Sequence, residues 1–333
     1  MKFSLDQQQR DFAASIDAAL AAADVPAAIR AWIGGDTAPG RAVWARLADL
    51  GVTALAVPER FDGIGAHPVD LVVAMERLGR WCVPGPVTES LAVAPVLLAD
   101  DDRAAALAAG ELIVTVAMPP AVPRAVDAEF ADLTLLATDA GVSDASVGAH
   151  HESVDPARRL FDVEANGQPR PADVARAYEF GVLATAAQLV GAGQAMLEES
   201  VAYAKQRTQF GRTIGSYQAI KHKLADVHIA CELARPLVFG AALSLADDSA
   251  HTARDVSAAK AAASDAALLS ARTALQTHGA IGYTAEHDLS HWLLRVQALH
   301  SAWGDPATHR RRVLEVLCLE APEVPCRQAP EVL

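Results

Sequence analysis

The chain has 333 residues, enough for two or three domains of ordinary size, and 52% of them are hydrophobic, which favours a large packed core over disorder. Its 41 acidic residues against 28 lysines and arginines give a formal net charge of −13. This balance excludes a general nucleic-acid binder, which needs a basic face to displace counterions. A phosphate-bearing ligand must instead be held by a local group of arginines and backbone N–H groups.

We expect a cytoplasmic protein with no membrane segment and no metal site. Residues 1–7 contain no apolar signal segment, and no run approaches the ~20 apolar residues of a membrane span. The four cysteines have no CxxC spacing. This predicts free thiols of a reducing compartment and argues against a disulfide framework or a zinc site.

The first third of the chain predicts an N-terminal α-helical domain over residues 1–110. Apolar residues recur at helical spacing within residues 12–20 and again within 44–50. A loop at residues 57–65 precedes the amphipathic run 71–78. The pattern is that of several short helices packed by one face.

The character of the sequence changes near Gly110. Residues 112–118 and 133–137 are short, partly β-branched and bounded by Pro, Gly and Asp, which predicts strands, and residues 160–163 read as another. The segment 111–170 therefore predicts a truncated middle β domain, a small sheet and hardly a full barrel.

Helix dominates again from residue 171. Apolar residues form a stripe at helical spacing over residues 182–204, and long helical patterns follow, which predicts a C-terminal four-helix-bundle domain over residues 171–320. The last helix has a clear start, because Asp305 is a favoured N-cap residue and Pro306 is favoured at the first helical position. Residues 321–333 form a Pro-rich tail.

The first motif in this helical half is Arg-Thr-Gln-Phe-Gly-Arg at residues 207–212. It follows one long helix and precedes the next. An arginine at such a turn suits a diphosphate, because its guanidinium makes paired charge-assisted hydrogen bonds and the next helix's N-terminus adds a positive dipole end. A plain helix hairpin with a surface arginine and a buried phenylalanine is the alternative interpretation.

The second motif is Gln-Thr-His-Gly-Ala-Ile-Gly-Tyr at residues 276–283. Gly279 and Gly282 end a helix and let backbone N–H groups face an anion. A simple helix C-cap glycine is a compatible interpretation. His278 receives no assigned role.

The order of helices, small sheet and helical bundle, together with these two motifs, resembles the acyl-CoA dehydrogenase family of flavoproteins over nearly the whole chain. The resemblance implies that FAD of a neighbouring subunit lies against both motifs, its ADP part at the first and its pyrophosphate at the second. The family usually has Gly-Gly where this chain has Gly279-Ala280. The resemblance assigns FAD binding to Arg207, Gln209, Phe210, Gln218, Gln276, Gly279 and Ala280.

Other features of the family are missing. Its members use a carboxylate to remove the α-proton of the acyl group, since no other step lowers that barrier enough. The two usual positions of this base fall at Gly304 and Gly181. Asp305 and Glu179 lie nearby as weak candidates, but their positions suit helix capping and a first-turn acid. The catalytic base is left unassigned.

The middle domain shows the same loss. Family members carry a Thr-Glu-Pro-x-x-Gly-Ser-Asp-like loop that hydrogen-bonds the flavin ring and the thioester. Residues 117–124 of this chain read Ala-Met-Pro-Pro-Ala-Val-Pro-Arg, without the Gly-Ser pair. The parts retained resemble those that reach a partner's FAD, and the parts lost resemble those that hold a subunit's own flavin and substrate.

The resemblance therefore implies a short subunit of an actinobacterial heteromeric (α2β2) acyl-CoA dehydrogenase, inactive alone, with a partner chain that supplies the base. The reaction implied is α,β-desaturation of an acyl-CoA thioester, such as a sterol side-chain CoA, with an electron-transfer flavoprotein as acceptor. Two alternatives stay open. One is a self-sufficient homodimer with a relocated base at Asp305 or Glu179. The other is a scaffold or regulatory relic without flavin.

Overall fold

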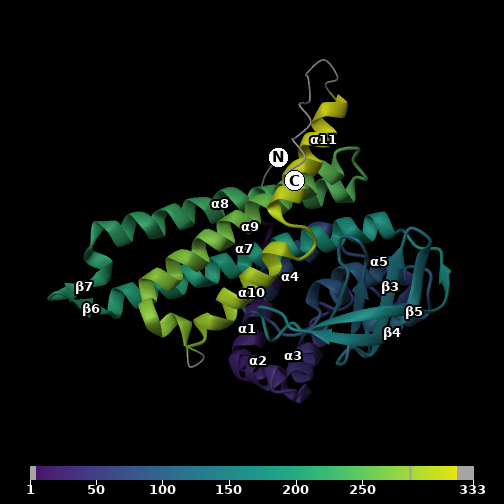
Figure 1. Ribbon diagram of the computed structural model, residues 1–333, viewed down its shortest axis with the longest axis horizontal. Helices are drawn as coiled ribbons and strands as arrows, with labels where there is room; N and C mark the ends of the chain where they lie inside the picture. Colours follow the sequence, from purple (N-terminus) through teal and green to yellow (C-terminus); the bar gives the residue numbers. More distant parts are fainter. Residues whose placement is uncertain (1–4, 285–286, 321–333) are drawn as a thin grey trace.

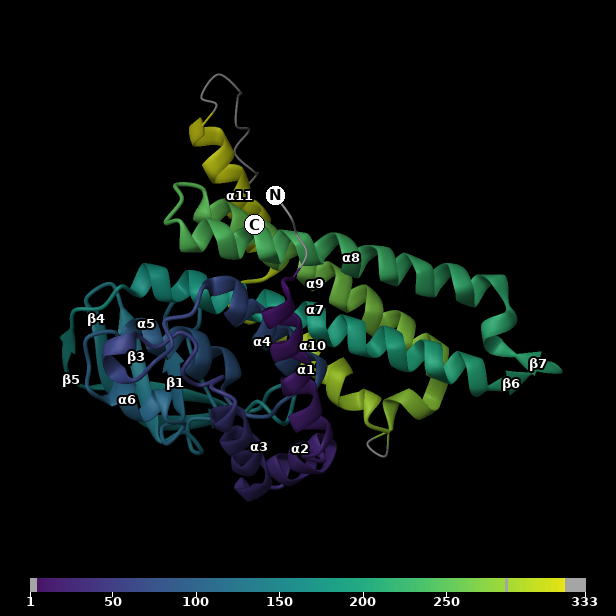
Figure 2. The same ribbon diagram turned by 180° about the vertical axis from the view of Figure 1, so that it is seen from behind.

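A computed structural model describes residues 5–284 and 287–320. Helices, a small sheet and a helical bundle follow one another in the chain, as expected from the sequence (Figure 1). The sheet lies against one end of the bundle, and the N-terminal helices pack beside both (Figures 1 and 2). Of the predicted limits of the middle domain, residue 111 lies in the loop before β1 and residue 170 is the last residue of β5. The predicted tail, 321–333, lies outside the described residues.

The N-terminal region consists of short helices around buried aromatic and aliphatic side chains. Its first helix begins with a capping box, in which Asp6 accepts from the backbone of Gln9 and the side chain of Gln9 accepts from the backbone of Asp6. Trp32 and Trp44 fill the core between these helices. The elements are α1 (Gln7–Ala21), α2 (Val25–Ile33), α3 (Ala38–Asp49), η1 (Glu59–Phe61), α4 (Pro68–Arg80), the π-helical turn η2 (Glu89–Val93), α5 (Ala94–Leu97) and α6 (Arg103–Ala108).

The middle region is one five-stranded sheet with the order β1-β3-β4-β5-β2. β1 and β3 are parallel, and the other pairs are antiparallel. The small sheet is confirmed, although the sequence pattern did not predict β2 or β4. The outer halves of β4 and β5 are exposed on both faces, so they lack the alternation of apolar residues that marks a strand. The strands are β1 (Val114–Ala117), β2 (Ala125–Val126), β3 (Leu133–Thr138), β4 (Gly141–His151) and β5 (Leu160–Arg170).

The C-terminal region is a bundle built around a buried central helix, α7 (Val174–Gln206), against which α9 packs. A short hairpin joins α7 to α8 and projects from the end of the bundle that lies away from the sheet (Figures 1 and 2). The remaining elements are β6 (Thr208–Gln209), β7 (Arg212–Thr213), η3 (Ile214–Ser216), α8 (Gln218–Ala246), α9 (Thr252–His278), η4 (Gly279–Tyr283), α10 (Leu289–Ser301) and α11 (Pro306–Glu320).

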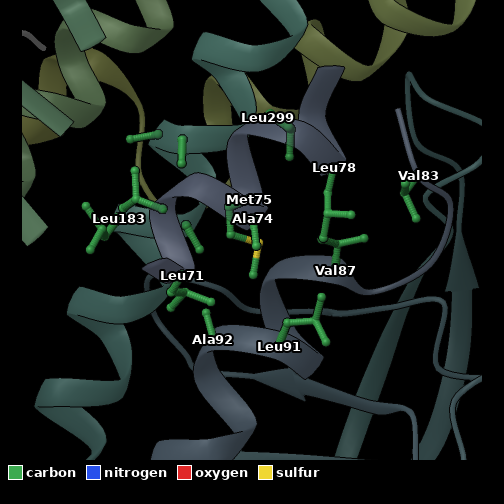
Figure 3. Packing of buried hydrophobic residues seen from close by; sticks show 14 of the residues in the cluster. Leu71, Ala74, Met75, Leu78, Val83, Val87, Leu91, Ala92, Leu183 and Leu299 are labelled. Atoms are coloured by element: carbon green, nitrogen blue, oxygen red, sulfur yellow. The ribbon is translucent and has the colours of Figure 1, made fainter. Parts of the chain in front are cut away.

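One apolar core joins the three regions. Figure 3 shows Met75 and Leu78 of α4 beside Val87 and Leu91, which flank the start of η2, with Leu299 of α10 in the same cluster. The turn η2 and the C-terminal end of α10 are therefore fixed to a common core.

The structure corrects two expectations drawn from composition. Within the described part of the chain, α7 and α8 are each long and apolar enough to cross a membrane, and α1 with α2 passes the same test as a bent pair. The most apolar window of α7 is 94% buried inside the protein, which accounts for its composition, whereas that of α8 is 39% buried. Cys82 and Cys231 are buried free thiols as expected, but Cys318 is disulfide-bonded.

Candidate functional site

The motif at residues 207–212 forms the two-stranded hairpin at the end of the bundle that lies away from the sheet, the open end (Figure 1). Thr208 pairs with Thr213 and Gln209 with Arg212. Phe210 and Gly211 form the turn with φ values of 50° and 77°, the positive pair that a tight hairpin turn requires. The ring of Phe210 is 91% exposed, so the alternative interpretation with a buried phenylalanine is wrong. The exposed ring of Phe210 is therefore free to contact another surface.

Arg207 is the unpaired cation of this hairpin. Within the described residues its exposed side chain has no hydrogen bond or ion pair, whereas Arg212 lies over the ring of Tyr217 at 3.9 Å. The hydroxyl of Tyr217 donates to the carbonyl oxygen of Gln209 at 3.2 Å and fixes the hairpin to the start of α8. Gln218 is the exposed first residue of α8. The charge of Arg207 is thus available to an anion placed beside the helix start.

The second motif lies at the same end of the bundle. The ring of His278, the last residue of α9, packs against Tyr203 near the end of α7 with a centroid distance of 4.4 Å. Its Nδ1 lies 2.8 Å from the carbonyl oxygen of Ala274, and burial lowers the pKa of His278 below its ordinary value. His278 is therefore a core residue that packs the end of α9 against the end of α7.

The exposed residues of the second motif leave space for a ligand. Gln276 is exposed and accepts a hydrogen bond from Lys223 of α8. Gly279 has a φ of 67°, and an added Cβ there would have no atom within 4 Å. Ala280 is also exposed. The side chain of Tyr283 lies outside the described part of the chain.

These observations fit a dinucleotide diphosphate. The open end offers the guanidinium of Arg207, which has no partner in the part of the chain that the structure describes, the exposed side-chain amides of Gln209 and Gln276, and the backbone at Gly279, where an added Cβ would meet no atom within 4 Å. All lie on the surface of this chain. Such a group holds only one side of a ligand, so another surface would have to cover the rest.

The two usual base positions lie at the opposite end of α7, the closed end, where neighbouring side chains fill the space around both glycines. A Cβ added to Gly181 would lie 2.3 Å from the ring of Trp303. Gly304 has a φ of 95°, and a Cβ there would lie 2.6 Å from Nε2 of His309. Trp303 is 1% exposed, and its carbonyl oxygen lies 2.9 Å from the same His309 nitrogen. Neither position accommodates a carboxylate side chain.

The two nearby carboxylates are engaged in structural contacts. Asp305 accepts a hydrogen bond from the backbone N–H of Thr308 at 2.7 Å, as an N-cap of α11, and this bond holds the pKa of Asp305 below its usual range. Glu179 is ion-paired with Arg312 of α11, with 3.1 Å between Oε2 and Nη1. Both carboxylates therefore stabilise the position of the last helix.

Sequence reasoning missed several buried charged residues at this closed end, among them Lys260 and Glu89. Nζ of Lys260 donates to the carbonyl oxygens of Leu299 at 3.1 Å and Gly304 at 3.0 Å, and burial lowers the pKa of Lys260 to about 7. Glu89, fully buried in η2, accepts from the indole N–H of Trp303 at 3.1 Å. Lys260 is the one charged residue of residues 258–263, and Glu89 is the one charged residue of the mostly apolar residues 83–98. A lone charge in such a stretch is the signal by which the sequence could have indicated a buried charged group. Among residues 5–284 and 287–320, no group of three or more His, Cys, Asp or Glu side chains could hold a metal ion.

Comparison with known proteins matches the two helical regions to family models. Residues 6–100 match "Acyl-CoA dehydrogenase, N-terminal domain", and residues 174–318 match "Acyl-CoA dehydrogenase, C-terminal domain". The chain is 32% identical to acyl-CoA dehydrogenase IpdE2 of Mycobacterium tuberculosis over 296 residues, which cover 86% of this chain and 90% of that protein.

Solved structures share the fold. A chain of the ChsE4–ChsE5 complex from Mycobacterium tuberculosis superposes with a TM-score of 0.83 at 23% identity, over 98% of this chain and all of that one. A chain of the Tcur3481–Tcur3483 steroid ACAD superposes with a TM-score of 0.82 at 20% identity, over 95% of this chain and 99% of that one.

Proposed function

This chain belongs to the acyl-CoA dehydrogenase family, and from that premise we propose that it is the subunit of a heteromeric enzyme that completes the FAD site without supplying the catalytic base. The observation that carries the proposal is the contrast between Gly181 and Gly279. The first, at a usual base position, is filled by an indole ring, while the second, in the motif expected to bind FAD, is open to solvent.

The residues proposed to hold the ADP half of FAD are those at the open end, with Arg207 facing the diphosphate. Its guanidinium has no competing partner within the described residues, so its charge and its directional hydrogen bonds would be available to the diphosphate. Bound FAD would supply the two-electron acceptor for α,β-desaturation of an acyl-CoA. Gln276 and the backbone at Gly279 would orient the pyrophosphate, and Phe210 would contact the partner chain.

The partner is proposed to be a second acyl-CoA dehydrogenase chain that carries the base. Two similar solved structures, the ChsE4–ChsE5 and Tcur3481–Tcur3483 assemblies, are each named for two different chains, and the second is named as a steroid enzyme. These names support a heteromeric assembly and a sterol-derived acyl-CoA as the substrate class. An electron-transfer flavoprotein stays the proposed acceptor.

The proposal is tested by substituting Arg207 in the complex of this chain with its partner. Arg207→Ala removes charge-assisted hydrogen bonds worth about 1.5–3 kcal/mol, so FAD should dissociate at least about ten-fold more readily. Retained flavin is measured by absorbance after gel filtration. Lys205→Ala, which removes an exposed cation two residues away, is the matched control and should retain FAD. Equal retention of FAD by the two variants contradicts the proposed role of the hairpin.

A further inference from the structure

Helix α8 is apolar on two opposite faces, and this chain covers only one of them. The helix lies along the side of the bundle away from α2 and α3 (Figures 1 and 2). Its inward face, with Cys231 and Val238, is buried. Its outward face carries Ile229, Leu233 and Leu237, whose exposed fractions are 55%, 68% and 45%. A helix that is apolar all round is normally buried all round, so a further surface is expected to cover this face.

The three exposed side chains form one continuous surface, which we call the α8 stripe (Ile229, Leu233 and Leu237). They are spaced four residues apart and therefore lie on the same side of the helix, one turn after another. Leu233 is the middle of the stripe and lies close to the middle of the 29-residue helix. Contiguous exposed apolar side chains of this kind mark a site of association.

The charges around the α8 stripe argue against a lipid surface. A helix that lies on a membrane carries lysine and arginine on its polar face, whereas the exposed acids Asp226 and Glu232 lie beside this stripe. The whole chain also has a formal net charge of −13, which an anionic bilayer repels. The occupant that fits is therefore another protein surface with apolar side chains.

The two ends of α8 carry opposite charges that are free to pair. Lys221 in the first turn and Asp247 at the C-cap are both exposed, and neither has an ion pair within the part of the chain that the structure describes. They lie at nearly equal distances on either side of Leu233. At about 100° per residue, both fall on the same flank of the stripe. An antiparallel copy of α8 centred on Leu233 would therefore bring Lys221 of each copy beside Asp247 of the other.

We propose that the α8 stripe binds the α8 stripe of a second copy of this chain, with the two helices antiparallel and a two-fold axis at Leu233. A two-fold interface uses the same patch on both copies, so a patch centred on one residue with opposite charges at its ends is self-complementary. This inference goes beyond the proposed FAD role and does not rest on it. Leu233 lies about 22 Å along the helix from Gln218, where α8 begins beside the hairpin.

The first test measures the mass of the full-length chain, purified alone, by sedimentation velocity over a range of concentrations. The wild type should dimerise, and Leu233→Glu should raise the dimer dissociation constant at least about ten-fold, because it places two carboxylates at the axis of an apolar contact. The matched control is Val147→Glu, which changes a residue that is 43% exposed on the outer half of β4 and should dimerise like the wild type. Far-UV circular dichroism checks that both variants are folded.

Single cysteines test the antiparallel orientation. Leu233→Cys places two thiols at the two-fold axis, where facing helices bring Cα atoms within the roughly 7 Å that a disulfide needs. Ile229→Cys separates its two copies by about 12 Å along the helices, because each lies four residues from the axis. Mild oxidation and non-reducing electrophoresis should therefore show a cross-linked dimer for Leu233→Cys alone. Equal cross-linking of the two variants contradicts the antiparallel arrangement.

Charge reversal tests the ends of the interface. Lys221→Glu should raise the dimer dissociation constant by about two- to ten-fold, since each dimer loses two exposed ion pairs. The double variant Lys221→Glu with Asp247→Lys should restore dimerisation, because the pair is re-formed with the charges exchanged. A double variant that dimerises no better than Lys221→Glu shows that these two residues do not face each other.

Two results overturn the proposal. The first is that the lone chain stays monomeric throughout the concentration range, which assigns the α8 stripe to another occupant. A complex with one copy of each acyl-CoA dehydrogenase chain then identifies that occupant as the second chain, and sedimentation with phosphatidylcholine vesicles identifies it as lipid. The second result is that Leu233→Glu dimerises as tightly as the wild type. Neither readout involves flavin, so failure here is distinct from failure of the proposed FAD site.

Discussion

The two ends of the helical bundle differ in what surrounds their glycines. At the open end, Gly279 has no atom within 4 Å of an added Cβ, and Gln276 and Ala280 beside it are exposed. At the closed end, Gly181 would place a Cβ 2.3 Å from the Trp303 ring. A glycine is thus open to a ligand in one place and required by close packing in the other. Only the environment, not the residue type, decides between these roles.

The largest expected effect is at Trp303, whose ring fills the space beside Gly181 at the closed end. Trp303→Ala removes a side chain that is 1% exposed and should lower the free energy of unfolding by about 3–5 kcal/mol. Urea or guanidinium unfolding, followed by far-UV circular dichroism, measures the change. A loss below about 1 kcal/mol would show that the indole does not fill the closed end.

The contact between Gly181 and Trp303 can be tested by a double-mutant cycle. Gly181→Ala alone should destabilise the protein by about 1–3 kcal/mol through overpacking against the ring. In the Trp303→Ala background the same change should cost little, because the space is free. Additive effects would contradict the packing. Gly240→Ala is the control, since an added Cβ there would meet no atom within 4 Å.

The next effect concerns Lys260, which holds the turn that carries Trp303. Its folded-state pKa of about 7 lies below the ordinary value of 10.5, so the unfolded chain binds more protons between these pH values. The Lys260 contribution to stability is present above pH 10.5 and is lost as the pH falls toward 7. It should add about 1.4 kcal/mol per pH unit to the slope of unfolding free energy within that window.

Lys260→Met should remove this part of the slope, as measured by urea unfolding at pH 7, 8 and 9. Lys205→Met is the control, because Lys205 is exposed near the open end of the bundle and should leave the slope unchanged. An unaltered slope in Lys260→Met would show that the amine titrates in the folded protein as it does in the unfolded chain.

The smallest effect is expected at Asp305, and it separates the two enzymatic interpretations. Asp305→Ala removes the hydrogen bond to the N–H of Thr308 and should cost about 1 kcal/mol of stability, with turnover of the complex retained. Asp305→Asn keeps a capping side chain and should restore most of the stability. Loss of turnover in both variants, with folding intact, would instead make Asp305 the relocated base.

Much of the fold followed from the sequence, because the helical stripes and the Asp305-Pro306 start reflect local preferences. The strand β4 did not, since its outer half is exposed and polar. The candidate site was likewise predicted only in part. The sequence placed Phe210 in a turn but left open whether its ring is buried, and its exposure depends on tertiary structure.

The closed end was the part that the sequence could not predict. Gly181 and Gly304 were seen as missing carboxylates, but the indole of Trp303 that blocks the first comes from a residue more than a hundred positions away. Glu89 meets Trp303 across an even larger separation, 214 positions. Contacts of this range are set by packing of whole helices and leave no local pattern to read.

The most direct test of a shared cofactor site is the visible spectrum of this chain, purified alone and purified together with the proposed partner, a second acyl-CoA dehydrogenase chain. We predict that flavin absorbance is absent from the lone chain and appears in the complex, with about one FAD per pair of chains if each site needs both surfaces. A lone chain that binds FAD and desaturates an acyl-CoA would contradict the central claim.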